Sequence, residues 1–236
     1  MSANVAHAHD GGEQLPPRVA VALAAAEIPP SKLGPARRAR LNAAEQALYV
    51  WILRRFASDG RPRSAETRVE ARRLGLDAEA AFAALAREDL VHLGADGEIT
   101  VSYPFSGLAT AHRVRFPSGN ETYAMCAIDA LGIAPMFRVE IEVASRDPVS
   151  GSDICARVAT DGAAEWQPEP AVVVAGVLDR QSDSCRGCCP VLNFFISAEN
   201  AERWLSEHPE VRGDVISMDE AAAAGQAIFG GVLTER

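Results

Sequence analysis

The sequence predicts an α+β fold, in which helices and antiparallel strands occupy separate stretches of the chain. Apolar residues recur every three or four positions in the first hundred residues, which is typical of amphipathic helices. Short alternating runs bounded by turn residues dominate the remainder and indicate strands. We therefore expect an N-terminal winged-helix-like helical domain, followed by a mixed or antiparallel β-sheet domain with helices.

Composition changes divide the chain into three parts. Residues 1–17 have little to bury and end in two prolines, so we expect a disordered tail. Residues 18–103 are predicted to form the winged-helix-like domain. Residues 104–236 are predicted to form an α+β catalytic domain, and all cysteines lie there.

The N-terminal domain is predicted from its helix signals and one hairpin. Pro35 suits the start of a helix, and Asp77 can cap another. The expected helices cover 18–27, 36–57, 64 to about 75 and 77 to about 86, and the expected hairpin strands cover 91–93 and 98–101. The last three of these helices, followed by the two-stranded wing, form the winged-helix pattern.

Winged helices often bind DNA, but this one lacks the charges for it. The helix that would enter the major groove is acidic and offers Arg87 as its one basic residue. A groove-binding helix needs basic or amide side chains for phosphates and base edges. We therefore expect a packing domain that covers part of the second domain, and no nucleic-acid partner.

The second domain is predicted from alternating strands and three helices. Strands are expected at 111–116, 138–143, 153–158, 171–178, 190–196 and 215–216, and helices at 122–136, 199–207 and from 218 onward. Ser217 and Glu220 form a capping box at the start of the last helix.

Charge and cysteine content narrow the protein class. The chain has 236 residues and a net charge of −9, all of it contributed by residues 101–236. No apolar run approaches the ~20 residues of a membrane helix, and the N-terminus carries no signal peptide. Five cysteines cannot all pair, so we expect reduced thiols, a cytoplasmic location and no membrane partner.

Cys126 and Asp129 are the first candidate pair. Three residues apart on a predicted helix, they would share one face. Their neighbours are apolar, and burial would raise the pKa of the carboxyl so that it could carry a proton. The alternative is that Cys126 packs as a small apolar residue while Asp129 faces water.

Three further thiols, Cys185, Cys188 and Cys189, lie within five residues, and Arg186 would favour their thiolate forms. A zinc site would require a second ligand pair, which is missing. A thioredoxin-like pair should open a helix, whereas this segment precedes a predicted strand. The third possibility is that two or three of these thiolates capture a soft metal ion. Cys155, in an alternating strand, is expected to pack structurally.

Two stretches resemble the organomercurial lyase (alkylmercury lyase) family. The first is TYAMCAIDALGIAPMF at 122–137, and the second is CCPVLNFFISAENAERWLSEH at 188–208. A weaker match covers 214–229. The family also carries a winged-helix-like domain that does not bind DNA. The resemblance implies a carbon–mercury lyase with two catalytic cysteines and one aspartate.

By resemblance, the catalytic residues are Cys126, Asp129 and Cys189. A one-residue gap would instead move the second cysteine to Cys188. Hg(II) is a soft ion that prefers thiolates. Two thiolates would hold the mercury, and the aspartate would protonate the departing carbon. Cys185 and Cys188 are expected to be additional mercury ligands.

The resemblance also implies the partners. They are a small organomercurial substrate and a thiol acceptor or mercuric reductase that receives Hg(II), and no organic cofactor is expected. Two other functions remain open on the same residues. One is a thiol-rich protein that sequesters soft metals without needing Asp129. The other is a metal-sensing winged-helix regulator.

Overall fold

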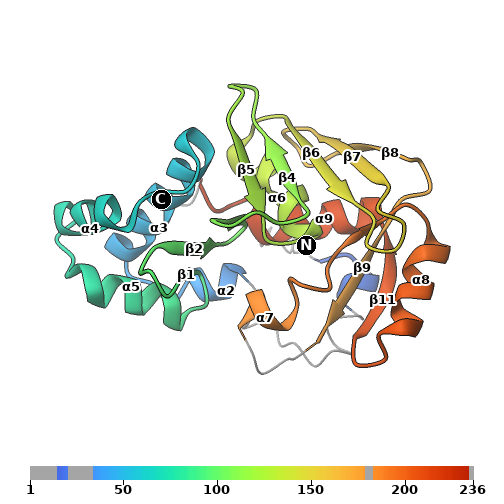
Figure 1. Ribbon diagram of the computed structural model, residues 1–236. Coiled ribbons are helices and arrows are strands. Elements are labelled where there is room, and N and C mark those ends of the chain that lie inside the picture. Colours follow the sequence, from blue (N-terminus) through green and yellow to red (C-terminus); the bar gives the residue numbers. More distant parts are fainter. Residues whose placement is uncertain (1–14, 21–33, 179–182, 234–236) are drawn as a thin grey trace, which may run out of the picture.

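The computed structural model describes residues 15–20, 34–178 and 183–233 (Figure 1). Most of the predicted tail at 1–17 and most of the predicted helix at 18–27 lie outside these residues. Within the described residues, no helix is long and apolar enough to span a membrane. The fold is α+β, with helices around a large antiparallel sheet and a smaller second sheet.

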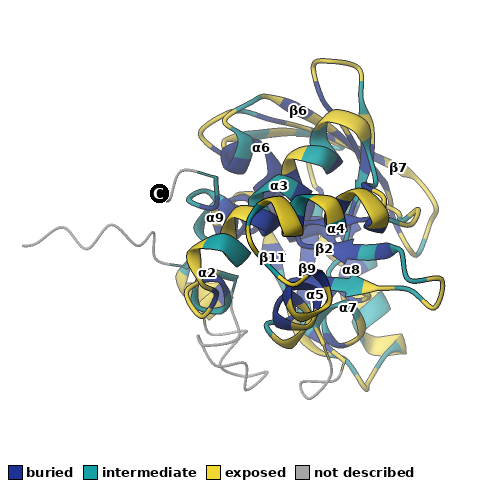
Figure 2. Cartoon of the chain, turned by 90° about the vertical axis from the view of Figure 1, so that its left-hand side faces the viewer, coloured by how far each residue is buried: buried dark blue, intermediate teal, exposed yellow. Residues whose placement is uncertain are grey.

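The N-terminal helices follow the predicted order with one correction. The single helix expected at 36–57 is two helices, α2 (Gly34–Arg38) and α3 (Ala43–Asp59). The break occurs because Asn42 caps α3 and forms a capping box with Glu45. Helices α4 (Ser64–Arg73) and α5 (Ala78–Arg87) follow, and Asp77 caps α5 as predicted. In Figure 2, α4 and α5 expose one face to solvent, whereas α6 lies inside.

The larger sheet has eight strands in the order β1-β2-β3-β5-β4-β6-β7-β8, and all described pairs are antiparallel. The strands are β1 (Val91–Leu93), β2 (Ile99–Ser102), β3 (Phe105–Ser106), β4 (Arg113–Arg115), β5 (Glu121–Ala124), β6 (Ile141–Arg146), β7 (Asp153–Val158) and β8 (Ala164–Gln167). The predicted hairpin, β1 and β2, is continuous with the rest of this sheet through β3.

The smaller sheet places β9 (Val172–Val177) between β10 (Phe194–Phe195) and β11 (Arg212–Ser217). Helix α8 (Ala198–Glu207) packs on it through Ala201, and Trp204 contacts Phe195. The strand predicted at 190–196 is shorter than expected. Residues 188–192 instead form a turn that is held by backbone hydrogen bonds within the segment. Phe194 and Phe195 then pair with β9.

The segment before Asp129 differs from the prediction in a way that matters for the site. Residues 121–124 form β5, paired with β3 and β4, and helix α6 (Ala127–Phe137) begins only after Cys126. Thr122 and Tyr123 suit a pleated strand, and this strand forms a hairpin with β4 while its other edge pairs with β3. Cys126 is therefore the N-cap of α6 and does not lie within the helix.

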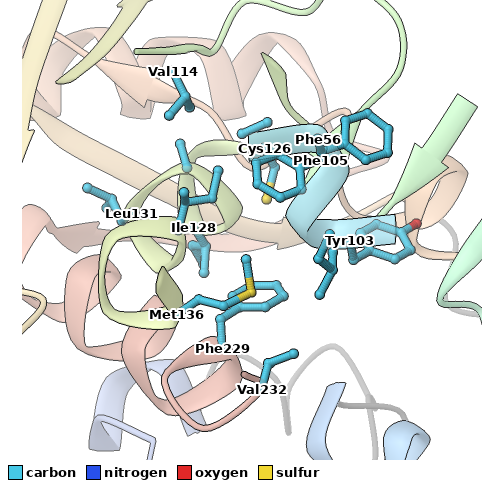
Figure 3. Packing of buried hydrophobic residues seen from close by; sticks show 14 of the residues in the cluster. Phe56, Tyr103, Phe105, Val114, Cys126, Ile128, Leu131, Met136, Phe229 and Val232 are labelled. Atoms are coloured by element: carbon cyan, nitrogen blue, oxygen red, sulfur yellow. The ribbon is translucent and has the colours of Figure 1, made fainter. Parts of the chain in front are cut away.

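Helices α6 and α9 (Met218–Phe229) pack closely at the centre of the molecule (Figure 3). A Cβ on Gly132 would lie 2.4 Å from Phe229 Cδ2, and one on Gly225 would lie 2.7 Å from Gly132 N. Neither position has space for a side chain. The two glycines therefore set how closely α9 approaches the helix that carries Asp129.

Gly225→Ala tests this contact. We expect the added methyl group to push α9 away from α6 and to lower the free energy of unfolding by about 1–3 kcal/mol, measured by urea denaturation. Ala223→Ser, at an exposed position of the same helix, is the control and should change stability little. A Gly225→Ala protein as stable as the control would contradict the close packing.

Candidate active site

Cys126 lies where strand β5 gives way to helix α6. Its backbone is extended, and its sulfur accepts a hydrogen bond from the Asp129 backbone N–H at 3.4 Å. The next residue, Ala127, donates its N–H to the Leu192 carbonyl at 2.9 Å. That bond ties the start of α6 to the segment that carries the other cysteines. The thiol is buried, and Figure 3 shows its sulfur directed into the apolar cluster.

Asp129 is the third residue of α6 and faces the Cys126 sulfur. The Cys126 thiol donates to Asp129 Oδ2 at 3.1 Å, so the predicted contact exists. The contact arises from N-cap geometry, whereas the prediction placed both residues on one face of a helix. Both arrangements bring residues three apart together. Asp129 is only 7% exposed, so the alternative that its carboxyl faces water is wrong.

Cys189 reaches the same place from a distant part of the chain. It belongs to the cysteine loop, which we define as residues 184–193 between β9 and β10. Its thiol lies 3.9 Å from Asp129 Oδ2, as a donor to the same oxygen that Cys126 contacts. Ligand atoms of Cys126, Asp129 and Cys189 all lie within 4.8 Å of one another, and all three residues are buried.

The low-polarity surroundings control the protons of this group. Burial raises the pKa of Asp129 to about 7 and that of Cys126 to about 12. The hydrogen bond to Cys126, together with that to Cys188 and burial, raises the pKa of Cys189. The site therefore keeps the Cys126 and Cys189 thiols neutral at rest, and its carboxyl can gain or lose a proton near neutral pH.

The cysteine loop is anchored by a residue that the sequence analysis did not single out. Asp89 Oδ2 accepts hydrogen bonds from the Ser184 backbone N–H at 3.0 Å and from its hydroxyl at 2.7 Å. Arg37 pairs with the same oxygen, and His92 Nε2 lies 2.6 Å from Oδ1. Although burial opposes ionisation of Asp89, these contacts together hold its pKa below the usual value. Asp89 thus joins the N-terminal helices to the loop.

Ser184 transmits this anchoring to the thiols. It begins the short helix α7 (Ser184–Gly187), and its carbonyl accepts the backbone N–H groups of Cys188 at 3.0 Å and Cys189 at 2.9 Å. No sequence motif marks Asp89. Its left-handed backbone, with φ of 52°, is set by the turn between α5 and β1 and becomes visible only in the structure.

The remaining cysteines lie outside the buried group. Cys185 and Cys188 are half-buried, and Cys188 shares a hydrogen bond with Cys189 that lowers the pKa of Cys188. Cys155 is exposed on β7, so the expectation that it packs structurally is wrong. The alternation of β7 places Ile154 inward, and Cys155 therefore points outward.

Comparison with known proteins identifies the family. The sequence model described as alkylmercury lyase matches residues 105–230, just over half of the chain. The chain belongs to the alkylmercury lyase family. The matched region contains Cys126, Asp129 and Cys189, and the resemblance noted from the sequence is confirmed.

Curated relatives support the assignment. An alkylmercury lyase of Staphylococcus epidermidis is 28% identical over 136 residues, which cover 58% of this chain and 61% of that protein. One from Bacillus cereus is 31% identical over 108 residues, covering 46% and 49%. The chain therefore spans about half to three-fifths of the length of these relatives.

A crystal structure of the mercury-bound form of MerB2 shares the fold. Its TM-score is 0.71 at 20% identity, and the alignment covers 86% of this chain and 98% of that one. At this identity the similarity concerns architecture. The alignment must include residues before 105, because its share of the chain exceeds what residues 105–236 could supply.

Asp129→Asn tests the burial of the carboxyl. The pKa of Asp129 is about 7 in the folded protein, against 3.8 for a solvated aspartate, so ionisation destabilises the folded state increasingly as pH rises between those values. The substitution should therefore stabilise the protein at pH 8, by up to about 4 kcal/mol, and much less at pH 4. Thermal unfolding across this pH range measures the difference.

The exposed Glu169→Gln variant is the control for that measurement, since it also removes one carboxylate. It should show no comparable gain at pH 8. Equal stabilisation of the two variants would mean that Asp129 is solvated in the folded protein.

Proposed function

We propose that this protein is an organomercurial lyase that cleaves the carbon–mercury bond of R–Hg⁺ to give R–H and Hg(II). The observation that carries the proposal is the buried group of Cys126, Asp129 and Cys189. Two thiols match a soft metal, and a carboxyl with a pKa of about 7 matches a proton carrier. Membership of the alkylmercury lyase family supports the same reaction.

The reaction begins with substrate capture. The Cys126 sulfur binds the mercury of R–Hg⁺ and its proton is released to solvent, because a thiolate bound to a soft metal is stabilised even where burial opposes the free ion. Cys189 then gives its proton to the Asp129 carboxylate, which lies within 3.9 Å. Its sulfur becomes the second mercury ligand.

Bond cleavage follows from the two-thiolate complex. The second sulfur raises electron density on the metal, and the Hg–C bond polarises toward carbon. Asp129 delivers its proton to that carbon, the electron pair of the Hg–C bond forms the new C–H bond, and R–H leaves. Mercury stays Hg(II) on Cys126 and Cys189, and Asp129 is again a carboxylate.

Apolar walls serve both the substrate and the acid. Ile128 and Leu131 of α6 and Phe105 of β3 are buried in the same cluster as Cys126. Such surroundings accept the organic group of the substrate. They also exclude water, which keeps the pKa of the carboxyl in the range where it can exchange protons.

The wider assignments complete the proposal. We infer that a thiol acceptor or mercuric reductase takes the Hg(II), that the reaction uses no organic cofactor, and that the protein acts in the cytoplasm without nucleic-acid or membrane partners. We also propose that residues 18–103 act as a winged-helix-like cover and residues 104–236 as the catalytic domain. The contact of Asp89 with Ser184 supports the covering role.

Substitution of the three residues tests the mechanism. With phenylmercury and excess thiol, Asp129→Ala, Cys126→Ser and Cys189→Ser should each lower single-turnover benzene formation at least ~100-fold, the usual scale for losing a proton-transfer group. Gas chromatography of released benzene measures it. Exposed Cys155→Ser is the matched control and should react as the unsubstituted protein does.

The same assay separates the alternatives. Cys188→Ser should still form benzene, because its sulfur lies outside the buried group. If Cys188→Ser abolished benzene formation and Cys189→Ser retained it, the second catalytic thiol would be that of Cys188. Mercury binding without benzene in the unsubstituted protein would instead indicate a sequestering protein, for which Asp129 is dispensable.

A further inference from the structure

Tyr103 is a buried group that the proposed mechanism does not use. It is 6% exposed, and its hydroxyl oxygen makes no hydrogen bond of normal geometry among the described residues. A buried hydroxyl without a partner loses its hydrogen bonds to water and gains none in return. Such a group is expected to have an acceptor in some functional state of the protein.

The rest of Tyr103 is held firmly. Its backbone N–H donates to the Leu90 carbonyl at 3.2 Å, and its own carbonyl accepts the Tyr49 hydroxyl. The edge of its ring meets His92 at a centroid distance of 6.4 Å. These contacts fix where the hydroxyl points. In Figure 3 it is directed away from the other labelled side chains of the cluster.

The hydroxyl faces the cysteine loop. It contacts the Cys185 thiol, and its other acidic neighbours include Cys189 and Asp129. A neutral thiol is a weak acceptor, whereas a thiolate or a metal-bound sulfur is a strong one. The hydroxyl therefore gains a good partner only when Cys185 has lost its proton.

A second thiol of the loop, that of Cys188, belongs to the same short turn as Cys185. Cys188 follows three residues later, at the end of the α7 turn, and residues at this spacing lie on one face. The Cys188 sulfur lies 3.5 Å from the Ser184 carbonyl, which holds it against the turn. Exposed Arg186 adds a positive charge beside both.

Burial decreases along the row of sulfurs. Cys126 and Cys189 are 2% and 5% exposed, whereas Cys188 and Cys185 are half-buried. Cys189 shares hydrogen bonds with Cys126 on one side and Cys188 on the other. The row thus connects the dry site of bond cleavage to the surface.

We propose that Cys185 and Cys188, with the Tyr103 hydroxyl as hydrogen-bond donor to Cys185, form a second Hg(II) site through which the product leaves. Its role as an exit rests on the proposed lyase function, but its affinity for Hg(II) does not. Cys188 bonds to the mercury as the Hg–Cys126 bond breaks, and Cys126 takes the proton that Cys188 releases. Cys185 then displaces Cys189 in the same way, so mercury stays Hg(II) throughout.

Titration with HgCl2 tests the second site without requiring catalysis. The unsubstituted protein should bind two equivalents tightly and leave only Cys155 reactive toward a thiol reagent. Cys185→Ser should bind one equivalent. In a Cys126→Ala/Cys189→Ala protein, only the second site remains, and Tyr103→Phe should weaken it about tenfold, the scale of one hydrogen bond to a charged group.

Tyr123→Phe and Cys155→Ser are the matched controls, and neither should weaken the second site. The proposal would be overturned if the unsubstituted protein bound only one equivalent of Hg(II). It would also be overturned if Tyr103→Phe and Tyr123→Phe left the second site with equal affinity for Hg(II). If the double variant fails to fold, the number of Hg(II) equivalents bound by the unsubstituted protein still tests the second site. Absence of benzene would overturn the lyase function and leave this binding result intact.

Discussion

One carboxyl group held out of water between two thiols is the constraint on which the rest of the structure depends. Asp129 touches the Cys126 sulfur at 3.1 Å and the Cys189 sulfur at 3.9 Å, and burial raises its pKa to about 7. In water the same group would be ionised at neutral pH and could not hold a proton for a leaving carbon. The burial opposes stability, so packing elsewhere must offset it.

That offset comes from elements that also fix the geometry of the three groups. Gly132 and Gly225 allow α9 to close against α6, which surrounds Asp129 with apolar side chains. The bond from Ala127 N–H to the Leu192 carbonyl then joins α6 to the cysteine loop. Asp89 anchors the other end of that loop through Ser184. Two segments separated by about 60 residues are thereby brought to one point.

The sequence was informative wherever a local rule decided the outcome. Asp77 and Ser217 were recognised as helix caps, and a spacing of three predicted the contact of Cys126 with Asp129, although as an N-cap contact. The strand at 121–124 takes the place of an expected helix start because it forms a hairpin with β4 and also pairs with β3. The apolar neighbours of Cys155 favour packing, but the period of two places Cys155 on the same exposed face as Asp153 and Arg157. Asp89 and Tyr103 carry no local signal at all.

The arrangement of the thiols resolves a conflict between cleavage and release. Cleavage requires dry surroundings, because water would lower the pKa of the carboxyl and solvate the thiolates. Release requires contact with an outside acceptor, which a buried two-thiolate complex excludes. Adjacent residues in one loop satisfy both needs, since Cys189 is buried while Cys188 is half-buried beside it. In the proposed transfer the ion passes from the buried pair to Cys188 and Cys185, which changes its environment and does not require the core around α6 to open.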